Sequence, residues 1–136
     1  MTNKKDIRWK QRFENFEKAY RLLERTVQIK KPSEAEKGGT IQFYEMAFEL
    51  AWKMLKDYLE SEGLNAQSPR EVLKTAYQYE VITNGHEWLD ALDDRNLTAH
   101  TYDENTADLV VENIKSRYFE LLKEVYISFR HKKEIT

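Results

Sequence analysis

The stretch TIQFYEMAFELAWKMLKDYLESEG, residues 40–63, has the spacing of a long amphipathic helix. Its apolar side chains recur at intervals of three and four residues, which places them along one face of an α-helix. These side chains are Ile41, Tyr44, Phe48, Ala51, Leu55 and Tyr58. Thr40 is a favoured N-cap residue and Gly63 a favoured helix stop, so we predict a helix that begins near Thr40 and ends at Gly63. Further apolar residues widen the stripe, so this helix can contact two neighbours at once, as bundle helices do.

Helical spacing continues on both sides of this stretch. Before it, the apolar residues from Phe13 to Val27 predict a first helix over about residues 6–30, which Pro32 and the pair Gly38-Gly39 are expected to end. After it, Ser68-Pro69-Arg70-Glu71 supplies an N-cap serine, a first-turn proline and a capping-box glutamate in order. This run predicts the start of a shorter third helix.

The last third of the chain is also helical in pattern. Asn84-Gly85 marks a turn, and the apolar residues after it define a short helix that leads toward Arg95. Asp103 can cap a last helix, in which apolar residues from Ala107 to Phe129 again step by three and four for about 25 residues. No stretch alternates convincingly between apolar and polar residues, as a strand would.

We therefore predict an all-α protein, an up-and-down antiparallel bundle of four to five helices. A coiled coil is the alternative for the long helices, but the short connections favour the compact bundle. The sequence contains no internal repeat, low-complexity segment or linker, so residues 1–136 are expected to form a single domain.

Composition excludes several classes of protein. The chain contains no cysteine, which rules out disulfides, thiolate metal sites and a cysteine nucleophile. Its 22 Lys and Arg residues against 24 Asp and Glu residues argue against holding long nucleic acid by charge alone. No apolar run approaches the roughly 20 residues of a membrane span, and the N-terminus leads into charged residues. We expect a cytoplasmic protein that neither enters a membrane nor is secreted.

The residues best suited to chemistry lie in the run RNLTAHTY, residues 95–102. On a helix, Arg95, Asn96, His100 and Tyr102 would fall on neighbouring stripes of the surface. A histidine whose pKa is near neutrality can take and return a proton, and an arginine can offer two donors to a phosphate. Together they suit phosphodiester cleavage.

A purely structural interpretation of the same run is that Arg95 pairs with a neighbouring aspartate and His100 caps a helix end. Acidic residues do crowd this region: Glu87, Asp90, Asp93, Asp94, Asp103 and Glu104. They could hold Arg95 in place, cap the last helix, or dock the basic surface of a partner, and the sequence leaves these alternatives open. No metal-ligand spacing recurs among the histidines and carboxylates, so we predict neither a metal nor a cofactor. For Glu45 and Glu49, a pair with Lys53 and a partner contact are both open, and neither residue is assigned a catalytic role.

The run from Arg95 to Tyr102 resembles the HepT branch of the HEPN superfamily. That superfamily shares an arginine, a polar residue after it and a histidine a few positions later, and HepT proteins add a tyrosine two residues after the histidine. Arg95, Asn96, His100 and Tyr102 match all four positions. Residues 43–53, 56–59 and 68–70 also resemble nucleotidyltransferase substrate-binding proteins, so the resemblance covers nearly the whole chain.

The resemblance implies a function and a partner. It implies a homodimer with two such motifs facing each other across a cleft, in which His100 activates the ribose 2'-hydroxyl and Arg95 stabilises the transition state. Asn96 would orient the phosphate or the imidazole, and RNA would be cut without metal to leave a 2',3'-cyclic phosphate. Tyr102 is the position that HepT relatives present for AMPylation by an MNT-type nucleotidyltransferase encoded nearby, which thereby acts as the antitoxin.

Two functional hypotheses follow. The first is a HepT-like toxin of a HEPN/MNT toxin-antitoxin module, an endoribonuclease neutralised at Tyr102. The alternative is a non-catalytic substrate-binding subunit of a two-protein nucleotidyltransferase, and a third is a scaffold that keeps the motif for dimer packing. The sequence does not identify the RNA target or small-molecule substrate, and it does not establish whether the nuclease is active or what the full stoichiometry is.

Overall fold

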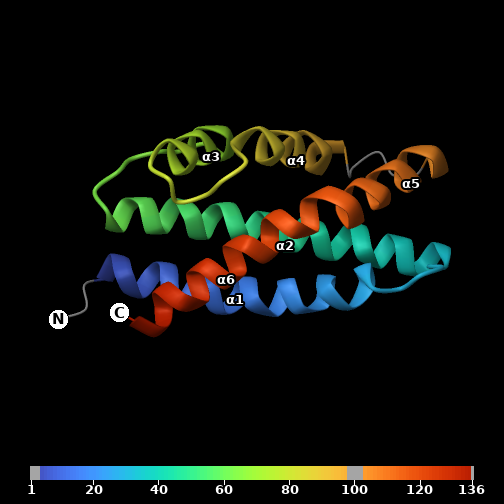
Figure 1. Ribbon diagram of the computed structural model, residues 1–136, viewed down its shortest axis with the longest axis horizontal. Coiled ribbons are helices and arrows are strands. Elements are labelled where there is room, and N and C mark those ends of the chain that lie inside the picture. Colours follow the sequence, from blue (N-terminus) through green and yellow to red (C-terminus); the bar gives the residue numbers. More distant parts are fainter. Residues whose placement is uncertain (1–3, 98–102, 136) are drawn as a thin grey trace.

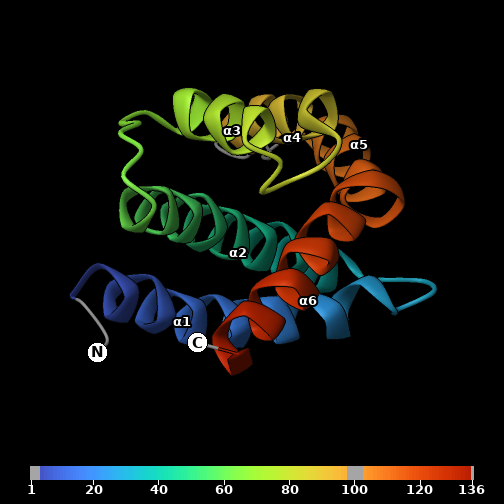
Figure 2. The same ribbon diagram turned by 60° about the vertical axis from the view of Figure 1, so that its left-hand side comes forward.

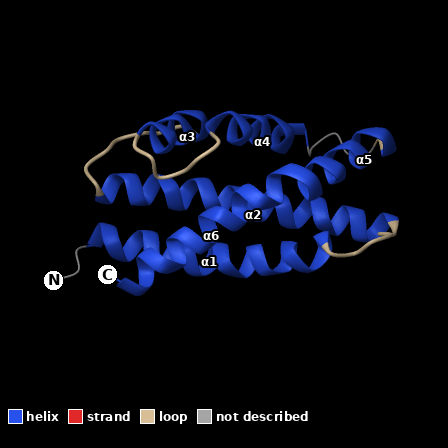
Figure 3. Cartoon of the chain, in the orientation of Figure 1, coloured by secondary structure: helices blue, strands red, loops and turns tan. Residues whose placement is uncertain are grey.

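The computed structural model describes residues 4–97 and 103–135, and within these ranges it contains helices and no strand (Figures 1 and 3). The helices are α1 (Lys4–Val27), α2 (Glu34–Ser61), α3 (Pro69–Gln78), α4 (Gly85–Leu97), α5 (Glu104–Asn113), the π-helix η2 (Ile114–Tyr118) and α6 (Phe119–Ile135). The last three form one uninterrupted rod from 104 to 135, which makes five rods in the described ranges. The all-α prediction is confirmed.

α2 occupies the centre of the bundle. α1 runs antiparallel to it on one side, while α3 and α4 lie on its other side (Figure 2). α6 runs diagonally across α1 and α2, and the start of α1 lies at the same end of the molecule as the end of α6 (Figure 1). The position of α2 confirms that its wide apolar face contacts more than one neighbour.

The core forms along α2, where side chains of the predicted apolar stripe and side chains next to it are buried. Tyr44 stacks on Tyr118 with ring centroids 5.9 Å apart, and Phe48 lies 6.0 Å from Trp88 on α4. All four side chains are at most 1% exposed. The centre of α2 therefore joins α4 to the rod of residues 104–135.

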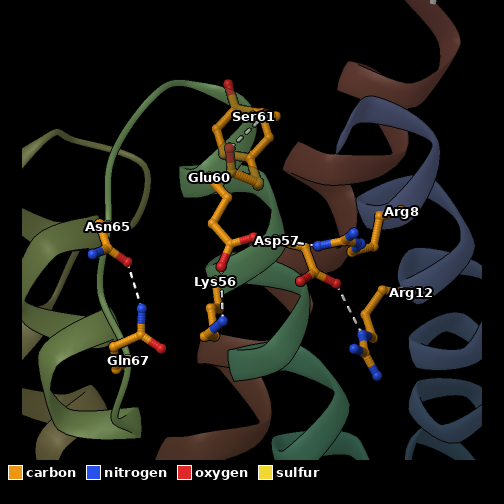
Figure 4. Close-up of polar contacts among 9 residues, drawn as sticks. Arg8, Arg12, Lys56, Asp57, Glu60, Ser61, Asn65 and Gln67 are labelled. Atoms are coloured by element: carbon orange, nitrogen blue, oxygen red, sulfur yellow. Dashed lines mark hydrogen bonds and ion pairs between the residues drawn. The ribbon is translucent and has the colours of Figure 1, made fainter. Parts of the chain in front are cut away.

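Ion pairs join α1 to the second half of α2 (Figure 4). Arg12 Nε donates to Asp57 Oδ2 at 3.1 Å, and Asp57 is buried. Arg8 Nη1 contacts Glu60 Oε2 at 3.4 Å, and Lys56 holds the other oxygen of Glu60 at 2.8 Å. The hydrogen bond from Lys56 is the main cause that lowers the pKa of Glu60, and the charges of Lys56 and Arg8 lower it further.

The predicted start of the second helix is wrong. The helix begins at Glu34, because Ser33 and Glu36 form a complete capping box: Ser33 Oγ accepts from the Glu36 amide at 3.1 Å, and Glu36 Oε1 accepts from the Ser33 amide at 2.9 Å. Gly38 and Gly39 therefore lie inside α2 rather than in the connection. A satisfied cap and the packing of the helix outweigh a cost of about 1 kcal/mol for each glycine. The first helix also ends at Val27, earlier than predicted.

The predicted start of the third helix is confirmed. Ser68 Oγ accepts from the Glu71 amide at 3.2 Å, and Pro69 is the first residue of α3. Glu71 does not complete the capping box as predicted, because its carboxylate accepts from the amide of Gln67 at 2.7 Å. The turn at Asn84 is also confirmed: Asn84 has a φ of 57° immediately before α4 begins.

Asp103 caps the last rod, as predicted: its side chain accepts from the Asn105 amide at 3.4 Å. The rod is not a regular α-helix throughout. At its π-helical segment the amide of Phe119 bonds to the carbonyl of Ile114, five residues back. This wider turn brings residues five apart toward the same face of the helix.

Candidate functional site

The four predicted site residues divide between described and undescribed parts of the chain. Arg95 and Asn96 lie in the last turn of α4. His100 and Tyr102 lie outside the described residues. The described geometry of the site is therefore that of Arg95, Asn96 and the residues around them.

Arg95 is held from α2. Its Nη2 donates a 2.6 Å hydrogen bond to Glu49 Oε2, and both side chains are 32% exposed. The Nζ of Lys53 lies 3.6 Å from the other oxygen of Glu49. A longer bond of 3.4 Å joins Arg95 Nη1 to the side-chain oxygen of Asn96. Glu49 thus positions a guanidinium that carries five donors in a fixed plane.

Glu49 is a site residue that the sequence did not reveal. Its predicted alternative pairing with Lys53 is present, but the shorter contact is with Arg95, 46 positions further along the chain. Helical spacing relates residues three or four apart and carries no information about such a distant contact. Only the packing of α4 against α2 brings the two side chains together.

Among the described residues, two surface hollows meet at the Glu49–Arg95 pair. The first has a volume of about 310 Å³ and is also lined by Trp52, Ser68, Pro69, Arg70, Leu92 and Asn96. The second has a volume of about 290 Å³ and is also lined by Gln42, Glu45 and Met46. The guanidinium therefore borders space on both sides that a ligand or a partner can enter.

The acidic residues of α4 bond to basic groups on other helices. Arg117 contacts Glu87 at 2.9 Å and Asp90 at 2.7 Å. The hydrogen bond from Arg117 lowers the pKa of Glu87 and raises that of the guanidinium itself. Asp93 pairs with Arg70 at 3.1 Å. Much of the negative charge that crowds the motif in the sequence is therefore compensated within the fold.

Asp94 has a different role, because it receives two neutral donors. Tyr118 Oη donates to Asp94 Oδ2 at 2.6 Å, and Asn113 Nδ2 donates to the same oxygen at 3.1 Å. Asn113 and Tyr118 are five residues apart: Asn113 immediately precedes the π-helical segment and Tyr118 is its last residue. The wider turn lets both side chains reach one carboxylate. This contact fixes the last turn of α4 beside Arg95.

Tyr44 on α2 also holds α4 in place. Its buried hydroxyl donates to the carbonyl of Ala91 at 2.6 Å. Burial raises the pKa of both Tyr44 and Tyr118, so both hydroxyls keep their protons near neutral pH and act as donors. The end of α4 that carries Arg95 is thus bonded both to α2 and to the rod of residues 104–135.

Within residues 4–97 and 103–135, no group of three or more histidines and carboxylates could hold a metal ion. None of the described helices combines the length and the apolar character needed to cross a membrane.

Comparisons with known proteins agree with the fold. A sequence model of the family described as "Nucleotidyltransferase substrate binding protein like" matches residues 11–131. The protein named "Probable ribonuclease HepT" from Haemophilus influenzae is 33% identical over 81 residues. That alignment covers 56% of this chain and 56% of the relative, so it spans little more than half of either protein.

Two solved structures share the fold. A crystal structure of a protein from Thermus thermophilus is 34% identical with a TM-score of 0.76, over 81% of this chain and 94% of that one. HI0074 from Haemophilus influenzae is 27% identical, also with a TM-score of 0.76, over 87% of this chain and 98% of that one. HI0074 is described as having the fold of a substrate binding domain of a nucleotidyltransferase. The present chain therefore belongs to the nucleotidyltransferase substrate-binding-like family and is a HepT-like protein.

Proposed function

We propose that this chain is the HepT-like toxin of a two-component HEPN/MNT module, a metal-independent endoribonuclease. The observation that carries the proposal is the guanidinium of Arg95, positioned by Glu49 at the border of two surface hollows. It stands just before the segment that contains His100, in a chain similar to a probable ribonuclease. We place the toxin and its partner in the cytoplasm.

The proposed reaction is an internal transfer of the phosphodiester. His100 accepts the proton of the ribose 2'-hydroxyl, whose oxygen attacks the adjacent phosphorus. The bond from phosphorus to the 5'-oxygen breaks and that oxygen takes up a proton, leaving a 2',3'-cyclic phosphate and a 5'-hydroxyl. Arg95 stabilises the charge that develops on the phosphate oxygens, and Asn96 orients the phosphate or the imidazole.

Two copies of the chain are proposed to form a homodimer that places two motifs across one cleft. The second hollow supports this arrangement, because Met46 is 41% exposed at its edge beside Arg95. Leu97, which is 43% exposed, follows at the end of α4. Methionine is enriched in protein interfaces relative to the rest of the surface, which makes Met46 a candidate contact with the second copy.

The nuclease is tested with the chain expressed alone and RNA cleavage measured in the presence of a chelator. We expect Arg95→Ala and His100→Ala each to lower the rate by at least about a hundredfold, as loss of a catalytic group does. The matched controls are Arg8→Ala and His131→Ala, which change exposed residues of α1 and α6. Cleavage that persists in the first two variants would remove both residues from catalysis.

A cognate MNT-type nucleotidyltransferase encoded nearby is proposed to silence the toxin by AMPylating Tyr102. An attached nucleotide brings negative charge and bulk next to Arg95 and so excludes RNA. The chain is incubated with that partner and ATP, and the modified residue is located by mass spectrometry. We expect AMP on the wild-type protein and on Tyr79→Phe, but not on Tyr102→Phe.

The second candidate function is a non-catalytic substrate-binding subunit of a two-protein nucleotidyltransferase. The family match and the description of HI0074 favour it. The same incubation separates the two functions, because transfer of AMP to a small molecule, with no AMP on Tyr102, supports the binding subunit.

A further inference from the structure

The three tryptophans of the chain have different environments, and all three are described. Trp9 and Trp88 are each 1% exposed and belong to the core. Trp52 is only partly buried and lines the first hollow, beside the Glu49–Arg95 pair. One part of the Trp52 indole packs against the core, but this packing does not explain why the rest of the ring is exposed in the hollow.

The lining of this hollow combines apolar surfaces with two basic groups and one carboxylate, that of Glu49, which pairs with Arg95. Trp52 comes from α2, Pro69 from the first turn of α3 and Leu92 from α4. Arg70 and Arg95 add positive charge from two different helices. A volume of about 310 Å³ lies at the lower end of the range for small-molecule sites, about 300–1,000 Å³, which suits a ligand the size of one nucleotide.

The chemistry of the lining favours a base joined to a phosphate. Aromatic side chains bind unpaired bases by stacking on them, and arginine binds phosphate through paired donors. Arg70 already meets a carboxylate, Asp93, at 3.1 Å, but both side chains are at least half exposed, so a phosphate can compete for the guanidinium. The amino end of α3, where Ser68 and Pro69 line the hollow, adds the positive end of a helix dipole.

We infer that the first hollow is a subsite for one unpaired nucleotide of an RNA strand, with its base on Trp52 and its phosphate toward Arg70 and Arg95. The inference deepens the proposed function and rests on it, since it places this nucleotide next to the phosphate that Arg95 contacts. Trp52 and Arg70 then determine which RNA is cut. A base inside a duplex cannot stack on Trp52, so the subsite selects single-stranded RNA.

Tryptophan fluorescence of the complete chain tests the subsite directly, because Trp9 and Trp88 are shielded from ligand. The probes are AMP, ribose 5-phosphate, and an uncleavable 2'-O-methyl oligonucleotide as a single strand and as a duplex. We expect AMP and the single strand to quench the Trp52 signal in a saturable way. We expect ribose 5-phosphate and the duplex to leave it unchanged.

Affinities measured by calorimetry assign the effect to individual side chains. Trp52→Leu is expected to weaken binding of the single strand by about tenfold or more, whereas Trp52→Phe, which keeps an aromatic face, retains most of it. Arg70→Ala is expected to weaken binding about threefold to tenfold through loss of a phosphate contact. Tyr79→Leu is the matched control, because Tyr79 is 54% exposed at the other end of α3, outside this hollow.

The results also separate this inference from the nuclease. In a cleavage assay, Trp52→Leu is expected to raise KM for single-stranded RNA with kcat within about threefold, since stacking contributes to binding rather than to the reacting atoms. Equal affinity of Trp52→Leu, Trp52→Phe and wild-type protein, or equal binding of AMP and ribose 5-phosphate, would overturn the subsite even if RNA is cleaved. Saturable quenching by AMP in a protein that cleaves no RNA would instead overturn the nuclease and keep the nucleotide site.

Discussion

At the scale of single residues, the contact between Glu49 and Arg95 explains how an arginine near the end of a helix keeps one orientation. The carboxylate comes from the centre of α2, whose other face is buried, so its position is set by the core. An arginine held in this way loses less conformational freedom when it binds a phosphate. Glu49 is thus expected to act on RNA cleavage through Arg95.

Replacement of Glu49 by glutamine tests that role. We expect Glu49→Gln to lower the rate constant of RNA cleavage by about tenfold, because the guanidinium loses its charged partner. The free energy of unfolding should fall by no more than about 1 kcal/mol, since the pair is partly exposed. Single-turnover cleavage and thermal unfolding measure the two effects.

The matched control is Glu134→Gln, which removes one exposed carboxylate at the far end of α6 and should leave both quantities unchanged. An unchanged cleavage rate in Glu49→Gln would mean that the carboxylate does not position Arg95 for the reaction.

Site residues that belong to a local motif could be predicted from the sequence, whereas those that meet through contacts between distant segments could not. Arg95 and Asn96 could be selected from the sequence because the motif is local. Glu49 could not, because its contact with Arg95 joins two helices 46 residues apart. For the same reason the partners of the acidic residues on α4, such as Arg117 and Tyr118, became visible only after the helices had packed.

At the scale of helices, the start of α2 shows how two local signals can compete. Ser33-Glu34-Ala35-Glu36 has the pattern of a capping box, but Gly38-Gly39 follows at once and indicates a break. The cap prevails, since both of its hydrogen bonds are made and the helix continues into the core. Helix starts without a competing break signal, at Ser68 and Asp103, were predictable from the sequence.

Gly38 offers a test of this helix start. A Cβ atom at Gly38 would meet nothing within 4 Å, so Gly38→Ala is expected to raise the free energy of unfolding by about 0.5–1 kcal/mol. Gly63→Ala serves as the opposite case, because Gly63 has a φ of 81° and alanine is strained there. Urea unfolding of both variants gives the comparison, and a loss of stability in Gly38→Ala would contradict a helical Gly38.

The π-helical segment could not be predicted, because the apolar spacing of the last rod continues across it. The segment consists of one widened turn. That turn allows Asn113 and Tyr118 to donate hydrogen bonds to Asp94. These hydrogen bonds depend on the position of α4, so the local sequence around the π-turn contains no pattern that predicts them.

At the scale of the whole molecule, buried apolar side chains from every helix form one continuous cluster. We propose on this basis that residues 1–136 form a single domain. Unfolding by urea should then show one transition, with the same midpoint by circular dichroism and by tryptophan fluorescence. Separate midpoints for the two signals would indicate more than one unit.

Buried tyrosines predict how the fold responds to alkaline pH. Burial is the main cause that raises the pKa of Tyr20 to about 12, and it also raises the pKa of Tyr44 and Tyr118. In the unfolded chain a tyrosine has a pKa of about 10. The stabilising contribution of the protonated phenols is therefore complete below about pH 10 and is lost as the pH rises through about 12.

Titration of tyrosinate absorbance, followed together with circular dichroism, measures this loss. We expect the buried tyrosines to ionise only as the helical signal disappears, whereas urea-unfolded protein titrates near pH 10. Complete ionisation of the eight tyrosines with the helical signal intact would show that burial does not protect them.

The start of α1 and the end of α6 lie near each other, and this has a practical consequence. α1 begins and α6 ends at the same end of the molecule, whereas the Arg95 end of α4 faces the opposite end, next to α5 (Figure 1). A tether or fluorescent label joined to either end would therefore stand clear of the site. Chains anchored to a surface through that end would present Arg95 and both hollows to RNA and to a partner in solution.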